Sequence, residues 1–405
     1  GMDESSKPDT QKELMLTAQY FVYARVAWQG MTEKESRSLE WFLPRKKVNL
    51  PQLMDSLLSE GDSLFIYEPV YRQYGLLKQQ LKKYRDIEAM GEWAEIKTER
   101  KTYKPRDSST VVEAIRKRLY LLGDINSDNH SLVYDEELIN GIKSFQQRVG
   151  IKQDGIMGPA FFKEINYPIG KRIEQIIVNM ERSRWLPQEP GGYYLAVNIP
   201  AFSLLAYHGD SLLWTMKVVV GKAIHETAVF YGELKYVVFS PYWNVPPGIM
   251  KNEVLPAIRR NPNYLERQNM EWNGNSVRQK PGPNNALGLV KFLFPNSYNI
   301  YLHDSPAKSL FELDKRAFSH GCIRVSRAWD LTKWLLRDYP EWTDEKIEAA
   351  MHAGKERFFT LKETVPVFIT YFTSWVDRKG KINFREDVYK RDSRLAQMIM
   401  ENPRI

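Results

Sequence analysis

The sequence predicts an α+β protein in which helical segments precede a mostly antiparallel β region. Apolar residues recur at spacings of three and four between residues 13 and 186, as on one face of a helix. From Tyr193 onward, short segments rich in β-branched and aromatic residues follow one another, separated by Gly, Asp or Pro. The length of 405 residues is enough for about two to four domains.

The composition excludes several classes of protein. Apolar residues make up 43% and charged residues 27% of the chain, which excludes a wholly disordered or fibrous protein. The net charge is +8, but the charges are interspersed, so we do not predict nucleic-acid binding. No run of about 18 apolar residues predicts a membrane-spanning helix. The single Cys excludes an internal disulfide and a zinc site built from thiolates.

The helical part reads as a scaffold interrupted by a small unit. Residues 13–100 form its first part, and residues 169–190 return to it as a helix. In that helix the apolar positions follow the i, i+3, i+4, i+7 rule, at Ile173, Ile176, Ile177 and Met180. We therefore expect the returning helix to pack against residues 13–90.

Residues 106–168 read as three short helices. The first carries an apolar stripe that Gly123 closes, formed by Val111, Val112, Ile115, Leu119 and Leu122. The Phe145-Gln-Gln helix and the turn from Asp154 to Pro159 resemble the small three-helix peptidoglycan-binding module. This resemblance implies a glycan-binding unit, and a spacer without a ligand remains the alternative.

Residues 192–365 read as a β domain with one long interruption. Residues 246–283 are rich in Pro, Asn and Gly and contain a helical piece, which is typical of a cap or lid. Residues 366–405 read as a C-terminal strand extension, in which we expect residues 367–372 to pair with residues 381–384.

The lone thiol lies in a setting that suits a nucleophile. Cys322 is part of Ser319-His320-Gly321-Cys322-Ile323-Arg324. A glycine beside the sulfur lets a substrate carbonyl approach and frees backbone N–H groups for an oxyanion. An ordinary thiol has a pKa of about 8.5, so catalysis needs a nearby base. The candidates are His320, two residues away, and His303 upstream.

The arrangement of His303 and the Ser-His-Gly-Cys motif resembles the signature of the L,D-transpeptidases, the YkuD family of bacterial cysteine acyltransferases. Further stretches resemble the large Gram-negative, YcbB-like branch, at residues 41–44, 197–202, 243–246, 281–288, 291–296 and 316–322. The resemblance implies a mostly antiparallel β-sandwich catalytic domain, beside the helical scaffold and the peptidoglycan-binding module.

The resemblance also implies roles for individual residues. Cys322 would be the nucleophile, His303 its base, and the backbone carbonyl of Asp304 would orient the imidazole. The N–H groups of Gly321 and Cys322 would form the oxyanion hole, with help from Tyr301. Other residues would shape the pocket or line the cleft, namely Ser319, His320, Arg324, Trp243 and Asn244.

Arg324 departs from the Asn that many family members carry two residues after the Cys. Either it pairs with a substrate carboxylate or it braces the loop.

The implied reaction joins two peptidoglycan stem peptides. Cys322 would attack the carbonyl between residues three and four of a tetrapeptide stem, releasing D-Ala. An amine of a neighbouring stem would then resolve the thioester, giving a 3→3 cross-link. Two alternatives stay open, an L,D-carboxypeptidase using the same site and a non-catalytic wall-binding protein. Carbapenems would acylate the same thiol.

We predict no metal ion and no cofactor, because the sequence has no His-x-x-x-His cluster and no Gly-rich phosphate loop. The partners implied are stem peptides, glycan strands and cell-wall synthesis proteins that determine cell shape. A periplasmic location follows from that substrate. Gly1 before Met2 resembles the scar of a removed tag, so we expect an export signal or membrane anchor upstream.

Overall fold

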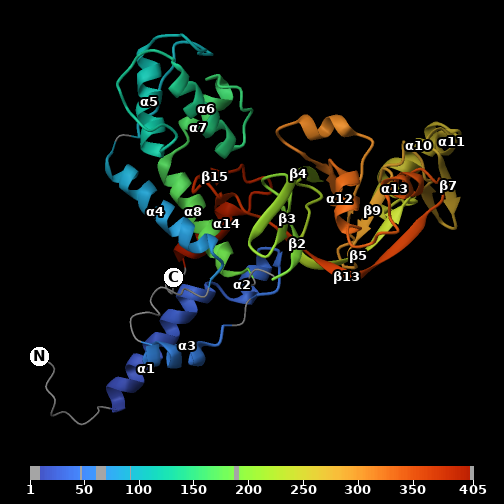
Figure 1. The fold of residues 1–405 in the computed structure, drawn as a ribbon, viewed down its shortest axis with the longest axis horizontal. Coiled ribbons are helices and arrows are strands. Elements are labelled where there is room, and N and C mark those ends of the chain that lie inside the picture. Colours follow the sequence, from blue (N-terminus) through green and yellow to red (C-terminus); the bar gives the residue numbers. More distant parts are fainter. Residues whose placement is uncertain (1–9, 46–47, 61–69, 92, 187–190, 402–405) are drawn as a thin grey trace, which may run out of the picture. The chain divides into compact units, whose positions relative to one another are not determined.

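The computed structural model describes residues 10–45, 48–60, 70–91, 93–186 and 191–401. Parts of the predicted scaffold, returning helix and C-terminal extension lie outside the described residues, as does the Gly1-Met2 start. The chain divides into two compact units. We call them the helical unit, Gly1–Glu189 with Phe372–Ile405, and the sheet unit, Pro190–Tyr371. Figure 1 shows the helices and strands that confirm the predicted α+β class.

The helical unit begins with short elements: α1 (Thr10–Ala24), the π-helical turn Arg25–Gln29, α2 (Glu33–Ser38), β1 (Trp41–Phe42), α3 (Leu50–Glu60) and α4 (Gln73–Ala89). A capping box starts α2. The Thr32 hydroxyl accepts a hydrogen bond from the Glu35 N–H, and the Glu35 carboxylate accepts one from the Thr32 N–H at 2.6 Å. No helix in the described part of the chain is long and apolar enough to cross a bilayer.

Three short helices follow: α5 (Thr110–Leu122), α6 (Glu136–Val149) and α7 (Pro159–Ile165). Side chains of Ser109 and Asp135 cap the N-termini of α5 and α6. Gly123 and Gly150 end the same two helices with positive φ angles of 81° and 74°, which glycine adopts without steric cost. The predicted apolar stripe of α5 is buried along its whole length.

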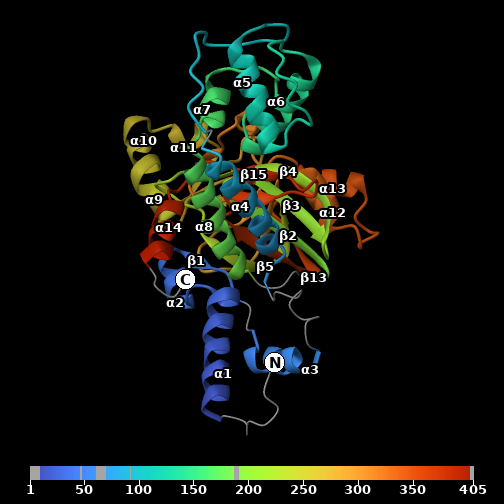
Figure 2. The ribbon, with the colours of Figure 1, turned by 90° about the vertical axis from the view of Figure 1, so that its left-hand side faces the viewer.

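The long helix α8 (Ile169–Arg184) packs against α4. Figure 2 shows the two helices side by side. Their shared core contains Leu77, Tyr84 and Ile87 from α4. It also contains Ile173, Ile176 and Met180 from α8. Burial of this apolar face, rather than helix propensity alone, stabilises both helices.

The C-terminal segment forms β14 (Ser374–Val376), β15 (Ile382–Phe384) and α14 (Asp392–Glu401). Our expectation that residues 367–372 pair with residues 381–384 is wrong, because β15 pairs with β14. Residues 367–370 instead continue β13 (Arg357–Thr370) of the sheet unit, in parallel register with residues 195–198. The chain leaves that sheet before it forms the hairpin.

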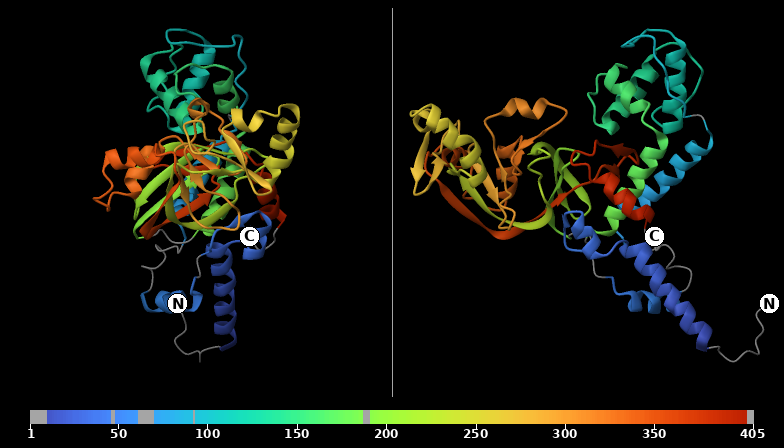
Figure 3. Two further views of the ribbon diagram at one scale, coloured as in Figure 1. Left: turned by 90° about the vertical axis from the view of Figure 1, so that its right-hand side faces the viewer. Right: turned by 180° about the vertical axis from the view of Figure 1, so that it is seen from behind.

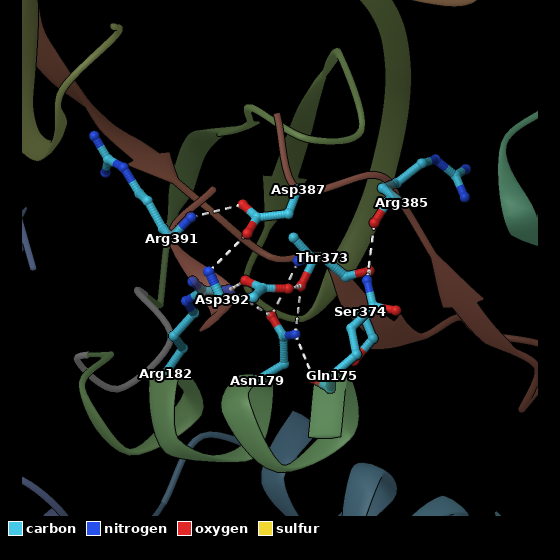
Figure 4. Close-up of polar contacts among 9 residues, drawn as sticks. All are labelled: Gln175, Asn179, Arg182, Thr373, Ser374, Arg385, Asp387, Arg391 and Asp392. Carbon is cyan, nitrogen blue, oxygen red and sulfur yellow. Dashed lines mark hydrogen bonds and ion pairs between the residues drawn. The ribbon is translucent and has the colours of Figure 1, made fainter. Parts of the chain in front are cut away.

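A buried polar network ties α8 to this segment (Figure 4). The fully buried Asn179 donates to Thr373 Oγ1 at 2.7 Å and accepts from the Thr373 N–H at 3.0 Å. Thr373 Oγ1 donates in turn to Asp392 at 2.6 Å, and Asp392 pairs with Arg182 at 2.7 Å. Gln175 donates to the backbone oxygen of Arg385 at 2.8 Å. Each buried polar group in this chain of contacts therefore has a partner.

The sheet unit contains one continuous hydrogen-bonded path of strands. Its members are β2 (Tyr193–Asn198), β3 (Ser203–His208), β4 (Ser211–Gly221), β5 (Val229–Phe239), β9 (Val290–Leu293), β10 (Leu302–His303), β12 (Ile323–Val325) and β13. Their order is β5-β13-β2-β3-β4-β12-β10-β9, and β9 pairs back with β5. The pairing is mostly antiparallel as predicted, and the path returns to its start instead of forming two separate sheets.

Further elements surround this sheet: β11 (Ala317–Ser319), which pairs with β4, the 3₁₀ turn Lys308–Glu312, α12 (Ala328–Leu335) and α13 (Asp344–Met351). The predicted insertion at residues 246–283 folds into α9 (Pro247–Ile249), the π-helical turn Met250–Val254, α10 (Leu255–Arg260), α11 (Tyr264–Arg267), β7 (Met270–Asn273) and β8 (Ser276–Gln279). Its strand β8 pairs with β6 (Trp243–Asn244), which lies just before the insertion. Figure 3 shows the insertion in yellow to gold as a cluster of its own. It has a separate small core of Val245, Met250, Val254, Met270 and Val277.

Asn179→Ala should destabilise the helical unit by about 2–4 kcal/mol, because it removes hydrogen bonds and leaves the buried Thr373 N–H unpaired. Urea unfolding followed by circular dichroism measures the change. Gln397→Ala is the control, since that side chain bonds Glu401 on the surface and should matter by less than about 0.5 kcal/mol. Equal stability of the two variants would contradict the prediction.

Candidate active site

Two short strands place the predicted site residues. β10 and β12 are parallel neighbours, with Leu302 beside Ile323 and His303 beside Arg324. Leu302 and Ile323 are fully buried in the core of the sheet unit. Successive side chains of a strand point to opposite faces, so the residues that alternate with them share the other face. These residues are Tyr301, His303, Cys322 and Arg324.

Hydrogen bonds within and around the loop fix the segment that carries the thiol. Ser319 Oγ donates to the backbone oxygen of Cys322 at 2.5 Å and accepts from the Gly321 N–H at 3.1 Å. The buried hydroxyl of Thr227 donates to the Gly321 oxygen at 2.8 Å. Gly321 has a φ of +110°, a conformation that favours glycine. Its N–H is already bonded to Ser319, so an oxyanion would compete with that side chain for this donor.

His303 is held as a neutral imidazole. Its ring is 3% exposed, and Nδ1 lies 2.5 Å from the backbone oxygen of Asp304. A carbonyl oxygen only accepts, so Nδ1 carries the proton and Nε2 is left as the acceptor. Burial, together with the nearby positive charge of Arg324, lowers the pKa of His303 to about 3.

The side chain of Asp304 has a structural role of its own. Its carboxylate accepts hydrogen bonds from the Leu289 N–H at 3.1 Å and from the Lys308 ammonium group. Gly288 lies directly against it with a φ of +64°, and a Cβ there would be 2.3 Å from Oδ2. The carboxylate thus braces the backbone whose carbonyl orients His303. The sequence did not single out Gly288, Leu289 or Lys308 for this role.

The environment of Cys322 favours the neutral thiol. Sγ lies 3.6 Å from the backbone oxygen of Asn299, a distance at which a thiol donates weakly. Burial raises the pKa of Cys322, while hydrogen bonds from Tyr301 and the charge of Arg324 act in the opposite direction. Burial also raises the pKa of Tyr301, which keeps the phenol protonated as a donor. The resting couple is therefore a thiol and a neutral imidazole.

The other predicted residues lie beside the insertion. His320 Nε2 lies 3.1 Å from Glu253 Oε1 in the π-helical turn Met250–Val254, and its ring lies 5.0 Å from that of His225. Partial burial lowers the pKa of His320. Trp243 packs against the insertion's core, and Asn244 is exposed on the same strand. Glu253 could not be predicted, because a lone Glu in a polar stretch has no distinguishing pattern.

Among the residues that the structure describes, no group of three or more His, Cys, Asp or Glu side chains could hold a metal ion.

Family comparisons match three stretches of the chain. Residues 192–367 match the YkuD family, described as an L,D-transpeptidase catalytic domain. Residues 2–81 match a family described as a scaffold domain, and residues 108–165 match a family of peptidoglycan binding domains. The comparisons do not separate the branches of the YkuD family, so the YcbB-like branch stays a prediction.

Individual proteins and solved structures that resemble this chain share 30% or less of its sequence in the aligned regions. A Haemophilus influenzae protein named as an L,D-transpeptidase is 30% identical over 243 residues, which cover 55% of this chain. The chain spans about half of that protein's length, 49%. An L,D-transpeptidase structure from Mycobacterium smegmatis has 13% identity and a TM-score of 0.26, covering 46% of this chain and 60% of that one. One from Stackebrandtia nassauensis has 14% identity and a TM-score of 0.29, covering 68% and 97%. These scores are too low to support an inference.

Gly288→Ala should destabilise the sheet unit by about 2–4 kcal/mol, because the added Cβ overlaps the Asp304 carboxylate at an already left-handed position. Gly274→Ala is the matched control. Gly274 has a φ of +62° but nothing within 4 Å of an added Cβ, so only the cost of the backbone conformation, about 1 kcal/mol, should appear. Thermal unfolding of both variants checks this, and equal losses would show that the contact with Asp304 does not matter.

The alkylation rate of the thiol should rise about tenfold per pH unit between pH 6 and pH 8. The reason is that burial raises the pKa of Cys322, while the low pKa of His303 prevents a thiolate–imidazolium pair. Iodoacetamide labelling followed by mass spectrometry measures the rate at one position, since Cys322 is the sole Cys. A rate already constant at pH 6 would mean that the ion pair exists at rest.

Proposed function

We propose that this chain, which carries a YkuD-family L,D-transpeptidase catalytic domain at residues 192–367 and a peptidoglycan-binding domain at residues 108–165, cross-links peptidoglycan stem peptides through a thioester on Cys322. The observation that carries the mechanism is the neutral His303, whose Nδ1–H is fixed by the Asp304 carbonyl on the strand beside Cys322. Such a couple of thiol, base and orienting group performs acyl transfer on unrelated folds.

In the first step, His303 Nε2 takes the thiol proton as Sγ attacks the carbonyl carbon of stem residue three. The Cys322 N–H and the Tyr301 hydroxyl stabilise the oxyanion, a role that the high pKa of Tyr301 supports. The C–N bond then breaks, and the imidazolium returns its proton to the departing amine of D-Ala. A thioester on Cys322 remains, and His303 is neutral again.

In the second step, the side-chain amine of a diamino acid on another stem attacks the thioester. His303 takes a proton from that amine and returns it to the sulfur as the C–S bond breaks. The new amide joins residue three of both stems, which is the 3→3 cross-link. Attack by water at the same carbonyl would give a tripeptide instead, which is the carboxypeptidase outcome.

The insertion at residues 246–283 serves in this proposal as the cap over the site. Its Glu253 contacts His320 of the catalytic loop at 3.1 Å, which supports the idea. A cap that excludes water would favour an amine over water as the acceptor. Trp243 and Asn244 on β6, the strand that pairs with the insertion's β8, would then face the substrate.

The remaining parts fit the same proposal. Residues 192–365 carry out the chemistry, residues 106–168 hold glycan, and residues 13–100 with 169–190 form the scaffold that joins them. The C-terminal part of the helical unit, Phe372–Ile405, completes the scaffold. In this proposal the protein acts on peptidoglycan outside the inner membrane, in the periplasm and near cell-wall synthesis proteins.

The test mixes the protein with a disaccharide-tetrapeptide that carries a diamino acid at position three, and analyses the products by mass spectrometry. We expect a cross-linked dimer that has lost one D-Ala, none with Cys322→Ala, and about 10²–10⁴-fold less with His303→Gln. Tripeptide without dimer would replace the transpeptidase by the carboxypeptidase. No product from the intact protein would refute the proposed reaction.

A further inference from the structure

Arg324 is a partly buried cation without an anionic partner. Its neighbours Ile323 and Val325 are fully buried in the core, so its side chain shares the opposite face of the strand with Cys322. The Nε atom is shielded from solvent and has no hydrogen-bond acceptor. Among the residues that the structure describes, no Asp or Glu forms an ion pair with this arginine.

Four buried arginines in the described part of the chain have carboxylate partners, whereas the buried Arg118 donates to the backbone oxygens of Ile165 and Ala94. Arg116 pairs with Asp135 at 2.6 Å, and Arg148 pairs with Asp124 at 2.5 Å. Two more such pairs occur in the helical unit, Arg172 with Glu164 and Arg182 with Asp392. A guanidinium nitrogen withdrawn from water without an acceptor is costly, and the Nε of Arg324 therefore calls for an explanation. A ligand that supplies the missing carboxylate is one explanation, and the position of Arg324 favours it.

Arg324 lies two residues after the nucleophile Cys322, so both side chains lie on the same face of the strand. The register sets Arg324 directly beside His303, and its charge acts on both His303 and Cys322. The reacting carbonyl must lie at Cys322 Sγ. An anion that meets Arg324 must therefore be attached close to the bond that breaks.

We propose that Arg324 binds the carboxylate of the D-amino acid that leaves during acylation. This inference rests on the proposed function. That carboxylate is bonded to the α-carbon next to the scissile nitrogen, which places it within one residue of Sγ. A guanidinium binds a carboxylate through two parallel hydrogen bonds, so it fixes orientation as well as charge. The anion departs with the leaving group, which accounts for an arginine that is unpaired in the ligand-free protein.

A consequence for specificity follows. A donor stem is recognised by Arg324 only when its chain ends at residue four, because a longer stem carries a neutral amide where the carboxylate would lie. Arg324 then selects the donor and has no contact with the acceptor amine.

The test compares two donors that differ in one group: a disaccharide-tetrapeptide with a free C-terminal carboxylate, and the same compound ending in D-alaninamide. Release of D-Ala or D-alaninamide in a single turnover reports acylation. The intact protein should acylate the acid about 10–100-fold faster than the amide. Arg324→Gln should lower the acylation rate of the acid to that of the amide, and change the acylation rate of the amide by less than about threefold. Arg324→Lys should restore part of the difference between the two donors.

Arg327→Gln is the matched control. Arg327 is half-exposed, lies next to the same strand and pairs with Asp330. This variant should keep the preference of the intact protein. Because the charge of Arg324 lowers the pKa of Cys322, alkylation of the free thiol should shift to higher pH in Arg324→Gln. That shift slows both donors alike, so the ratio of acid to amide acylation is the readout of carboxylate binding.

Three results would overturn the inference. Equal acylation rates of acid and amide in the intact protein would show that the carboxylate of the donor is not recognised, while leaving the proposed function in place. Equal slowing of both donors in Arg324→Gln, with the preference for the acid kept, would make Arg324 only a counter-ion of the thiolate. Acylation of neither donor by the intact protein would refute the proposed function and this inference together. The comparison within the intact protein stands even where a variant does not fold.

Discussion

The parallel pairing of β10 with β12 is the constraint on which the site depends. Each strand is short, yet their register places His303 beside Arg324 and buries Leu302 and Ile323 behind them. Because the side-chain period of a strand is two residues, a slip by one residue would turn His303 into the core. The buried pair on the core face therefore fixes the register, and with it the geometry of the catalytic face.

Burial decides the charge state of that face. An ion pair of thiolate and imidazolium would need solvation that the site does not offer, so the pKa of Cys322 is raised and that of His303 is lowered. The proton transfer is thereby delayed until a substrate carbonyl can take up the negative charge. A thiol that stays neutral at rest is also less open to oxidation, since the thiolate is the form that reacts.

The sequence predicted what depends on local pattern and left out what depends on distant contacts. The buried stripe of α5 and its terminal Gly123 follow from spacing alone, and the Ser-His-Gly-Cys motif located the nucleophile. Thr227, which holds the Gly321 carbonyl from 94 positions away, has no local signature. The tail was assigned the wrong partner for the same reason, because both candidate strands have suitable composition and only the tertiary structure selects between them.

The contacts around the catalytic loop differ in strength on its two sides. Gly321 and Ser319 are fixed by buried hydrogen bonds to the sheet unit, whereas His320 meets the insertion through a partly exposed contact with Glu253. A partly exposed ion pair contributes little stability, and the insertion keeps its own core of Val245 and its neighbours. A displacement of the insertion would thus break weak contacts and leave the nucleophile in place. A cap needs strong contacts on the side of the sheet and weak contacts on its own side, because its motion must not disturb the alignment of Cys322 with His303.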